Sequence, residues 1–533
     1  MSEALENPAG PESSAPASSG AGRILAVIDM GASAIRLTVA EAGADGTLRI
    51  MEEASRGVLL GKDTFTDGRI KAPTMQATVR VLKGFRRIME GYGVVRCRAA
   101  ATSAVREASN RDSFLDRVRL RTGIEVEVID GPEENRLTYL AVREVLGEHE
   151  MLRRGNTLLV EVGGGSADIS FLRAGEPVFS GTYALGSIRM RQALASWRGT
   201  HDRRVLLLRR HIHNVVEDIK REMPLREATH FIALGGDVRF AASRLGGSED
   251  ADARLRFLKE PEFITLCDQL AGETVDDLVE RFRLPLADAE TLVPALLAYN
   301  ELLLATSAEQ VTIPEASLRA GMILDLAVGE DARRREDFSR QVLASARAIG
   351  EKYRYDASHA ENVARMAVRL FDELKTEHGL ADRDRLLLEV ASLLHDVGLY
   401  INRRAHHKHS HYILSVSDIF GLSRDDMDVV ANVARYHRRA MPQKSHLPYM
   451  ALDRDTRVKV GKLAAMLRIA NALDADHLHK VRDLTLVRDE DEWTLEVDGA
   501  GDMTMERLAT LARSDLLTEV FGQKVSFREA ARP

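Results

Sequence analysis

The sequence predicts two α/β lobes, followed by an all-helical region and a small α/β module at the C-terminal end. Three observations predict this order. Apolar runs typical of strands alternate with helical periodicity from residue 23 to about residue 327. Strand patterns are missing between about 329 and 480, and the alternation typical of a hairpin returns after residue 481.

The first lobe is expected over residues 23–147. Its strand-like runs occupy 24–28, 35–40, 47–51, 95–101 and 124–129. Helical periodicity covers 73–90, 111–121 and 133–147. Residues 1–22 are rich in Ser, Ala, Pro and Gly and cannot bury enough apolar surface, so a flexible tail is expected there.

The second lobe is expected over residues 148–328. Three strands follow Thr157, and the remaining elements are helices around 187–197 and 205–222, a strand at 230–234 and a helical stretch through 327. The helical region covers 329–480, and the charge run at 331–336 links it or opens its first helix. The last module, 481–533, is expected to hold strands at 483–487, 493–497 and 524–527 and a helix at 505–512.

The composition is that of a soluble globular protein, with 533 residues, 45% hydrophobic and 29% charged. The sequence has neither an apolar run of about 18 residues nor a signal-peptide pattern at its start, so a cytoplasmic protein without a membrane partner is expected. Cys97 and Cys267 are far apart, which argues against a disulfide framework or a cysteine zinc site. The net charge is −7, and nucleic acid is not expected as a partner.

The most informative segment is the apolar run 156–162 with the three glycines that follow it. Gly163, Gly164 and Gly165 free the backbone to turn sharply and to bring NH groups close to an anion. Glu161 and Asp168 stand on either side of this loop, where they can hold a Mg²⁺ ion that bridges to phosphate oxygens. The alternative is an ordinary hairpin turn with solvated acids.

Two further loops of similar character follow apolar strands. The first has Asp29 and Gly31 at its turn and Arg36 just after it. The other has Gly235 and Gly236 between the strand at 231–234 and a helix. Two hairpin loops and one strand-to-helix loop can converge on one nucleotide or polyphosphate, and their arginines can fork onto phosphate oxygens.

Six motifs in order resemble the exopolyphosphatase and guanosine pentaphosphate phosphohydrolase family over about residues 23 to 330. They are the segments 29–36, 101–110, 131–136, 163–165, 185–189 and 235–236. The resemblance implies the α/β actin-like fold, in which two βαβ-rich lobes enclose a cleft, and a homodimer. The segments around His359, 394–398, 405–412 and 434–439 resemble the helical HD-type domain of longer family members.

The resemblance places the catalytic base on the acidic pair Glu133 and Glu134. We favour Glu134, with Glu133 as a helper or bystander and Arg106 as the catalytic arginine. Pro132 suits the first turn of a helix whose positive dipole end favours ionised carboxylates. The alternative is that both glutamates only stabilise the start of this helix.

The resemblance also implies the phosphate and metal ligands. Mg²⁺, or Mn²⁺, is expected on Glu161, Asp168 and Asp29. The residues expected to bind phosphate are Gly31, Ser33, Arg36, Gly163, Gly164, Gly165, Ser166, Arg189, Gly235 and Gly236. Arg136 and Arg239 are further candidates beside these loops.

Several residues depart from the family pattern. Glu161 and Asp168 stand where the family has Asp and Glu, and Ala167 and Ser33 replace Thr and Asn. Asp237 replaces a Thr, and its carboxylate would repel phosphate unless a cation lies between them. These changes predict retained hydrolysis with an altered metal or chain-length preference.

A second site in the helical region is implied by His359, His395 and Asp396, which resemble the metal ligands of HD phosphohydrolases. The usual fourth ligand position reads Asn471, with Asp474 one turn further on. We therefore favour a domain without catalysis of its own. Four histidines and a lysine can instead line a substrate channel or a solvated loop, namely His406, His407, Lys408, His409 and His437.

The function expected first is that of an exopolyphosphatase that releases terminal phosphate from inorganic polyphosphate. A guanosine pentaphosphate 5′-phosphohydrolase uses the same chemistry and is the first alternative. A catalytically weak polyphosphate or alarmone-binding regulator is the second alternative, suggested by Asp237 and Asn471. An actin-like kinase is disfavoured because no acceptor-site motif is visible.

Overall fold

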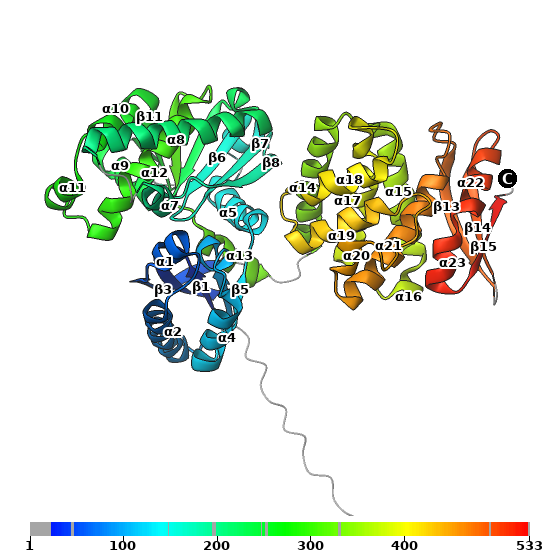
Figure 1. Cartoon of the computed structure of the whole chain (residues 1–533), viewed down its shortest axis with the longest axis horizontal. Helices are drawn as coiled ribbons and strands as arrows, with labels where there is room; N and C mark the ends of the chain where they lie inside the picture. Colours follow the sequence, from blue (N-terminus) through cyan, green and yellow to red (C-terminus); the bar gives the residue numbers. More distant parts are fainter. Residues whose placement is uncertain are drawn as a thin grey trace, which may run out of the picture.

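The structure is a computed structural model that describes residues 23–43, 47–147, 149–194, 199–246, 248–250, 254–328, 332–489 and 492–530. The expected tail at 1–22 lies outside these residues. Figure 1 shows two α/β lobes on one side of the molecule, a helical region beside them and a small sheet at the C-terminal end.

The first lobe is built on a five-stranded sheet with the order β3-β2-β1-β4-β5. β1 lies at its centre because its apolar side chains are buried on both faces. The strands are β1 (Arg23–Met30), β2 (Ala34–Ala42), β3 (Leu48–Gly57), β4 (Arg96–Ala101) and β5 (Val126–Val128). The helices of this part of the chain are α1 (Leu60–Asp67), α2 (Ala72–Tyr92), α3 (Ser103–Arg106), α4 (Arg111–Thr122) and α5 (Gly131–Leu146).

The second lobe is built on a seven-stranded sheet with the order β10-β11-β12-β9-β6-β7-β8. Its strands are β6 (Asn156–Val162), β7 (Ala167–Arg173), β8 (Glu176–Tyr183), β9 (His230–Leu234), β10 (Ser248–Asp250), β11 (Leu255–Lys259) and β12 (Gln310–Pro314). Its helices are α6 (Glu150–Arg153), α7 (Ser187–Ala193), α8 (His201–Glu222), η1 (Leu225–Glu227), α9 (Gly236–Leu245), α10 (Glu260–Ala271), α11 (Val275–Phe282), α12 (Leu286–Leu304) and α13 (Leu318–Val328).

The expected helical stretch after residue 234 is wrong in part, because β10, β11 and β12 interrupt it. β12 is only five residues long and buried at four of them, so it has no alternation of buried and exposed positions. Length and periodicity cannot separate such a short apolar run from a helix segment. Pairing with β9 and β11 makes it a strand.

The two lobes repeat one strand arrangement. The order β3-β2-β1-β4-β5 of the first sheet recurs as β8-β7-β6-β9-β12 in the second. In both sheets the first three strands pair antiparallel and the last two join in parallel. The β1–β2 and β6–β7 hairpins therefore occupy equivalent positions, although the sequence has no visible repeat.

Helices α5 and α13 cross between the lobes. α5 follows the strands of the first lobe but packs on β7 and β8 of the second, and α13 ends the second lobe but packs on β1 and β2 of the first. The two helices approach closely at Gly321, where a Cβ atom would lie 1.9 Å from the carbonyl oxygen of Leu137. Each sheet therefore packs against a helix that follows the strands of the other lobe in the sequence.

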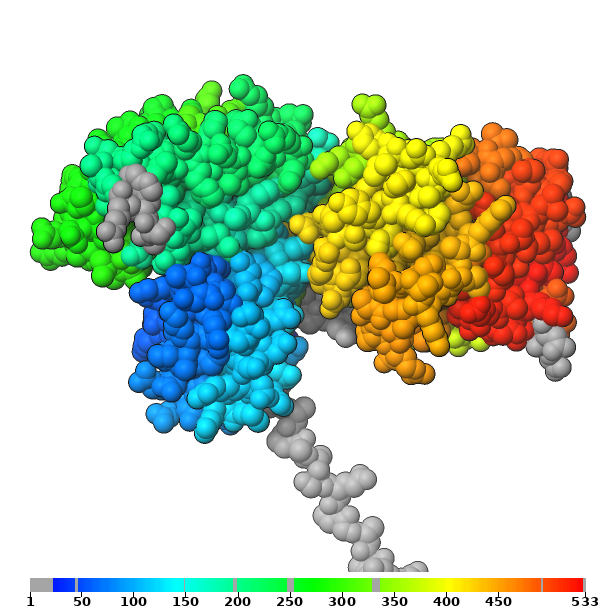
Figure 2. Space-filling view, viewed as in Figure 1, coloured from blue at the N-terminus to red at the C-terminus, as the bar shows by residue number. Residues whose placement is uncertain are grey.

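The helical region and the small module share one hydrophobic core, which runs from Val342 to Val525. Figure 2 shows this part of the molecule lying against the two lobes. The helices are α14 (Ala332–Lys352), α15 (Ala357–Glu373), α16 (Lys375–His378), α17 (Asp382–Leu394), η2 (Val397–Tyr400), α18 (His406–Ser415), α19 (Arg424–Arg435), α20 (Leu447–Met450) and α21 (Arg454–Ala472). The module holds β13 (Val481–Arg488), β14 (Glu492–Gly499), α22 (Thr504–Arg513), α23 (Asp515–Phe521) and β15 (Lys524–Glu529).

Candidate active site between the lobes

The β6–β7 hairpin presents two carboxylates side by side. Glu161 and Asp168 are directly opposite partners in this ladder, so their side chains lie on the same face. The Oγ1 of Thr138 donates to Glu161 at 3.0 Å, and the Oγ1 of Thr182 donates to Asp168 at 2.6 Å. The turn closes through a hydrogen bond from Gly163 N to Ser166 O of 2.9 Å.

The equivalent β1–β2 hairpin pairs a carboxylate with a guanidinium. Asp29 and Arg36 are opposite partners, and Arg36 Nη1 lies 3.4 Å from Asp29 Oδ2. Gly31 N donates to Ala34 O at 3.1 Å, which makes the turn tight. Ser33 lies in this turn and uses its carbonyl oxygen to accept from Val58 N.

The glycine hairpin of the second lobe lies directly against loops of the first. A Cβ atom on Gly164 would lie 3.0 Å from the Cβ of Ala32, and one on Gly165 would lie 2.1 Å from the Oγ of Ser103. Only glycine permits this approach at Gly165, because real Cβ contacts are essentially never so short. The hairpins therefore meet across the gap between the lobes.

The third loop is attached to the glycine hairpin by a tyrosine. The buried Tyr299 hydroxyl accepts from Val162 N at 2.8 Å and donates to Leu234 O. Gly235 follows with φ = +117°, a backbone conformation that side chains rarely adopt. A Cβ on Gly236 would meet no atom within 4 Å, so the start of α9 borders open space.

Glu134 is buried and paired with Arg106. Arg106 Nη1 donates to Glu134 Oε1 at 2.6 Å and to the carbonyl oxygen of Ile129 at the same distance. Asp130 caps α5 by accepting from Glu133 N at 3.2 Å, which places Glu134 in the first turn of the helix. Burial raises the pKa of Glu134 well above its ordinary value, and the charge of Asp168 adds to this rise.

Glu133 belongs to a different set of contacts. It accepts from Arg136 at 2.7 Å and from Arg98 at 2.9 Å, and both arginines also contact Asp325. Burial raises the pKa of Glu133, but the two arginines lower it below its ordinary value. The structure therefore separates the two adjacent glutamates: one lies with Arg106 and the other in an ion-pair network that joins α5, β4 and α13.

Burial dominates the electrostatics of the remaining acids. It raises the pKa of Glu161 to about 7, with the charge of Asp168 as the next cause, and that of Asp168 to about 6. Burial also raises the pKa of Asp237 to about 7, and Asp288 adds to this shift. The pKa of Asp29 is raised by burial in spite of Arg36.

Arg189 connects the lobes through three contacts. Its Nε donates to Gly165 O at 2.6 Å, its Nη2 donates to Glu107 at 2.5 Å, and its guanidinium lies 4.3 Å from the ring centre of Phe65. These contacts leave little of the guanidinium for phosphate. The expected phosphate-binding residue Arg189 thus lies beside the glycine loop and holds it against the first lobe.

Several residues of the site escaped the sequence analysis. Thr138 lies four residues after Glu134 on α5, and this spacing, which places both on one helix face, was the signal that could have found it. The charge of Arg319 on α13 acts to lower the pKa of Asp29, and the other charged neighbours of Arg319 include Arg36 and Arg239. No local motif marks Arg319, Thr182 or Tyr299, because tertiary packing brings them to the hairpins.

The donor set of the site suits a hard divalent cation such as Mg²⁺. Glu161, Asp168 and Asp29 offer carboxylate oxygens, and burial opposes their ionisation, so a bound cation would offset that penalty. Among the described residues, the oxygen atoms of these three carboxylates are not close enough together to form a preformed metal cluster. Mg²⁺ is commonly bound through one or two carboxylates, waters and substrate phosphates, which matches this open arrangement.

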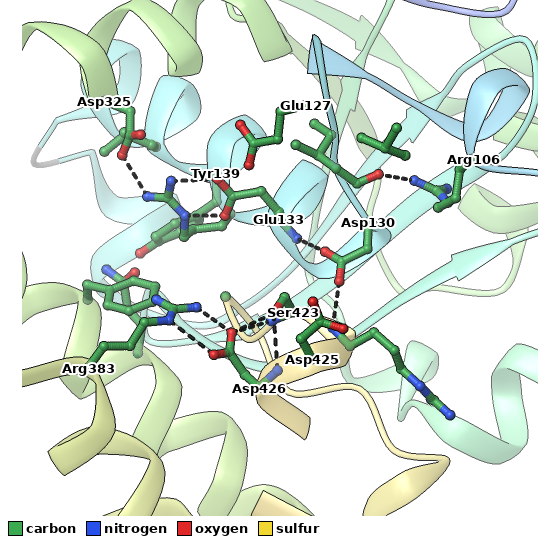
Figure 3. Close-up of a pocket in the computed structure, with 18 of the residues that line it drawn as sticks. Arg106, Glu127, Asp130, Glu133, Tyr139, Asp325, Arg383, Ser423, Asp425 and Asp426 are labelled. Carbon is green, nitrogen blue, oxygen red and sulfur yellow. Dashed lines mark hydrogen bonds and ion pairs between the residues drawn. The ribbon is translucent and has the colours of Figure 1, made fainter. Parts of the chain in front are cut away.

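A cavity of about 1150 Å³ lies between the first lobe and the helical region, and Arg106 forms part of its wall. Figure 3 shows residues of α5, α13, α17 and α19 around it. Its arginines are largely engaged: Arg383 pairs with Asp426 at 2.5 Å, and Arg136 with Glu133 at 2.7 Å. Arg424 N donates to Asp130 Oδ2 at 2.8 Å across the cavity, which links the helical region to the cap of α5.

In the second expected site, His359, His395 and Asp396 come together within 4.8 Å of one another. Asp474 lies behind them, where its Oδ2 contacts His359 Nδ1 at 2.7 Å. His406 and His437, which were expected to line a channel, also point at Asp396. Asn471, at the usual fourth ligand position, is buried on α21.

Fold and site together define a two-lobed actin-like phosphohydrolase with an appended helical domain. Residues 38–330 match the family model described as the Ppx/GppA phosphatase family, and residues 342–520 match the model of Ppx/GppA phosphatase domain III. Because the first match spans more than half of the sequence, the chain belongs to the Ppx/GppA phosphatase family.

Curated relatives extend the likeness over nearly the whole chain. A protein of Vibrio parahaemolyticus named guanosine-5′-triphosphate,3′-diphosphate pyrophosphatase is 24% identical over 492 residues, which cover 90% of this chain and 93% of the relative. A protein of Vibrio atlanticus with the same name is 25% identical, with 78% and 81% covered.

Among solved structures, an exopolyphosphatase from Cytophaga hutchinsonii covers 58% of this chain and 99% of its own, with 23% identity and a TM-score of 0.53. This neighbour confirms the actin-like fold. In the part of the chain that the structure describes, no helix combines the length and apolarity required to cross a bilayer.

Proposed function

We propose that this family phosphatase is an exopolyphosphatase, which hydrolyses the terminal phosphoanhydride bond of inorganic polyphosphate. In this proposal Glu134 orients and deprotonates the attacking water. The new P–O bond forms as the bond to the bridging oxygen breaks, and the shortened chain leaves as an oxyanion. Glu134 suits this role because it is buried and held by Arg106, with Asp168 nearby.

Positive charge at the site supports the same reaction. Arg106 lies between Glu134 and the large cavity, so its guanidinium can stabilise charge on the transferring phosphoryl group. A Mg²⁺ or Mn²⁺ ion held by Glu161, Asp168 and Asp29 would neutralise phosphate oxygens when bound. The exposed Gly236 at the start of α9 borders open space where the terminal phosphate can bind.

The observation that carries the choice of polyphosphate is the cavity that continues beyond Arg106. Its volume of about 1150 Å³ gives room for a chain of phosphates behind the reacting one. Because the arginines of the cavity are paired with carboxylates, an entering polyanion must replace those carboxylates as their partner. Binding of long chains is therefore expected to weaken as the salt concentration rises.

Guanosine pentaphosphate is the second candidate substrate. It is favoured by the relatives that share most of their length with this chain, because they are named guanosine-5′-triphosphate,3′-diphosphate pyrophosphatase. The reaction at the terminal phosphate would be the same, and the cavity would then receive the nucleoside.

The homodimer implied by the family resemblance stays a prediction, which light scattering of the full chain tests.

The test is phosphate release from long polyphosphate and from guanosine pentaphosphate in parallel, with and without Mg²⁺. Wild type is expected to release phosphate faster from polyphosphate, and Glu134→Gln is expected to lower kcat by about 10²- to 10⁴-fold. Glu125→Gln, an exposed control, should leave the rate unchanged. Faster release from guanosine pentaphosphate would select the second candidate, and binding without turnover would select a regulator.

A further inference from the structure

Tyr299 is buried beneath the place where two loops of the candidate site begin. It belongs to α12, which packs on β6 and on the helices α7 and α9 of the second lobe (Figure 1). The side chain is fully buried in the hydrophobic core of this lobe and is among the largest that are buried to this degree. Its ring therefore belongs to the core, whereas its hydroxyl contacts the ends of two strands.

The two strands are β6 and β9, parallel neighbours inside the second sheet. Their pairing reaches as far as Glu161 opposite Leu234. Gly163 N donates to Ser166 O within the β6–β7 turn, so the NH of the preceding residue, Val162, points toward β9. With this register, the last bond of a parallel ladder runs from Val162 N to Leu234 O.

The Tyr299 hydroxyl binds both atoms that this last bond joins. It accepts from Val162 N at 2.8 Å and donates to Leu234 O. The direction of both hydrogen bonds is fixed, because an amide NH can only donate and a carbonyl oxygen can only accept. Burial raises the pKa of Tyr299 well above its ordinary value, so the hydroxyl keeps the proton that it donates.

Both backbone groups stand next to a loop of the site. Val162 lies between Glu161 and the glycine triplet, and Leu234 is followed by Gly235. A Cβ atom on Gly235 would lie 3.1 Å from the oxygen of Tyr299. Because two hydrogen bonds hold this oxygen, it cannot move away from such an atom. The hydroxyl thus contacts the start of one loop and limits how close the other can come.

We propose that Tyr299 is a positioning residue for phosphate release, and that its hydroxyl fixes the spacing between the carboxylates of the β6–β7 hairpin and the loop at Gly235 and Gly236. The inference rests on the proposed function of these two parts and applies to polyphosphate and guanosine pentaphosphate alike. An in-line displacement needs its reacting groups held in place before the water attacks. Tyr299 would act only through the backbone, since its buried side chain is closed to substrate.

The first test is Tyr299→Phe in the full chain, which removes the hydroxyl and keeps the ring. Val162 N and Leu234 O lose the group that joins them, so the two loops should shift relative to each other. Small misplacements of reacting groups are costly, so kcat for phosphate release should fall by about 10- to 100-fold. KM should change little, because most of a long substrate would lie in the cavity away from Tyr299.

Binding of inorganic phosphate gives a second measurement that needs no turnover. Calorimetry in the presence of Mg²⁺ should show that phosphate binds about tenfold more weakly to Tyr299→Phe than to wild type. Tyr92→Phe is the matched control, since it removes a hydroxyl that donates to Glu52 at 3.1 Å in the first lobe. This control should change neither kcat nor the affinity for phosphate.

Tyr299→Leu separates positioning from packing, because it removes the ring as well as the hydroxyl. It should lower the melting temperature further than Tyr299→Phe does. If the ring alone mattered, Tyr299→Phe would match wild type in kcat and only Tyr299→Leu would be impaired. That result would overturn the positioning role.

Gly235→Ala tests the same spacing from the side of the loop. Its new methyl group would press against the hydroxyl, so kcat should fall more in the wild-type background than in the Tyr299→Phe background, which lacks that oxygen. The strain of a side chain at φ = +117° is the same in both backgrounds and cancels in the comparison. Equal losses in the two backgrounds would contradict the inferred contact.

Circular dichroism shows which variants are folded at the assay temperature. If Tyr299→Phe is unfolded, Gly235→Ala alone carries the test. Its control is Gly246→Ala, at a glycine that also has a positive φ but no atom within 4 Å of its Cβ position. Equal kcat values of these two variants would overturn the inference.

Failure of this inference can be distinguished from failure of the proposed function. If wild type releases phosphate from neither substrate, the proposed function fails, and the comparison of phosphate binding still tests Tyr299. If wild type is active and Tyr299→Phe keeps both its kcat and its affinity for phosphate, the positioning role is wrong and the proposed function stands.

Discussion

At the residue scale, the buried acids of the cleft make the stability of the fold depend on pH and would couple it to the proposed metal ion. Burial raises the pKa of Glu161 from 4.5 to about 7 and that of Asp168 from 3.8 to about 6. At a pH between the ordinary and the raised pKa of each group, the folded chain keeps a proton that the unfolded chain has lost. The free energy of unfolding of the metal-free protein therefore falls as the pH rises through this interval.

Mg²⁺ should restore the stability that is lost at high pH, because it competes with protons for the same carboxylates. We expect Mg²⁺ to raise the melting temperature more at about pH 8 than at about pH 5, since binding to the folded state stabilises it. Scanning calorimetry at both pH values measures the difference. The double variant Glu161→Gln, Asp168→Asn should lose it, and equal shifts at the two pH values in wild type would contradict the expectation.

Asp237 is expected to change the affinity for substrate with pH. Its pKa of about 7 means that the carboxylate ionises as the pH rises past neutrality, at the start of α9 beside the proposed phosphate site. Asp237→Asn should lower KM by about fivefold at pH 8, which corresponds to roughly 1 kcal/mol of charge repulsion, and change it little at about pH 6. Steady-state kinetics at both pH values checks this, and a pH-independent effect would argue against repulsion.

At the element scale, the site depends on how closely the β6–β7 hairpin approaches the first lobe. Gly165 faces Ser103 and Phe65, and its carbonyl oxygen accepts a hydrogen bond from Arg189 Nε. Gly131 plays a similar role at the start of α5, where a Cβ atom would lie 1.9 Å from the Oγ1 of Thr182. That approach allows Thr182 to reach Asp168. Small residues thus place the carboxylates and the helix start together.

Gly165→Ala should therefore be strongly disruptive. The new methyl group would overlap Ser103 Oγ and lie 2.6 Å from Phe65, and overpacking of this kind costs about 1–3 kcal/mol. We expect a lower melting temperature and loss of phosphate release, measured on the same sample. Gly236→Ala is the matched control for stability, since nothing lies within 4 Å of its Cβ position. Equal melting temperatures of the two variants would contradict the packing argument.

At the scale of the whole molecule, the helical region contacts the helix that carries Glu134. Asp130, the cap of α5, accepts from Glu133 N within the helix and from Arg424 N of the helical region. Arg143 and Asp337 form another link at 3.0 Å. The large cavity lies between these contacts, so the appended domain completes the wall of the proposed substrate path.

Arg383→Ala should weaken binding of long polyphosphate without slowing the chemical step. Its loss leaves Asp426 without its arginine and makes the cavity more negative, so KM should rise several-fold while kcat stays constant. Arg385→Ala, two residues away and paired with Asp372 outside the cavity, is the control. The two variants are compared by phosphate release, and an equal effect of both would rule out a role of the cavity.

Local residues were enough to predict the two hairpins and the strand-to-helix loop, because each depends on glycines and alternating apolar residues within a few positions. The helix start that carries Glu134 was predictable for the same reason, with Asp130 and Pro132 acting locally. The all-helical region and the final hairpin also follow from local periodicity. Strand β12 was missed, since pairing partners distant in sequence decide it.

Which side chains meet depends on tertiary packing, which local sequence does not reveal. This packing separated Glu133 from Glu134, because Glu133 pairs with Arg98 and Arg136, whereas Glu134 pairs with Arg106. It also exchanged α5 and α13 between the lobes and turned His395, His406 and His437 toward Asp396. Local sequence sets backbone conformation, whereas the packing of distant segments sets the partners, the burial and hence the charge of each side chain.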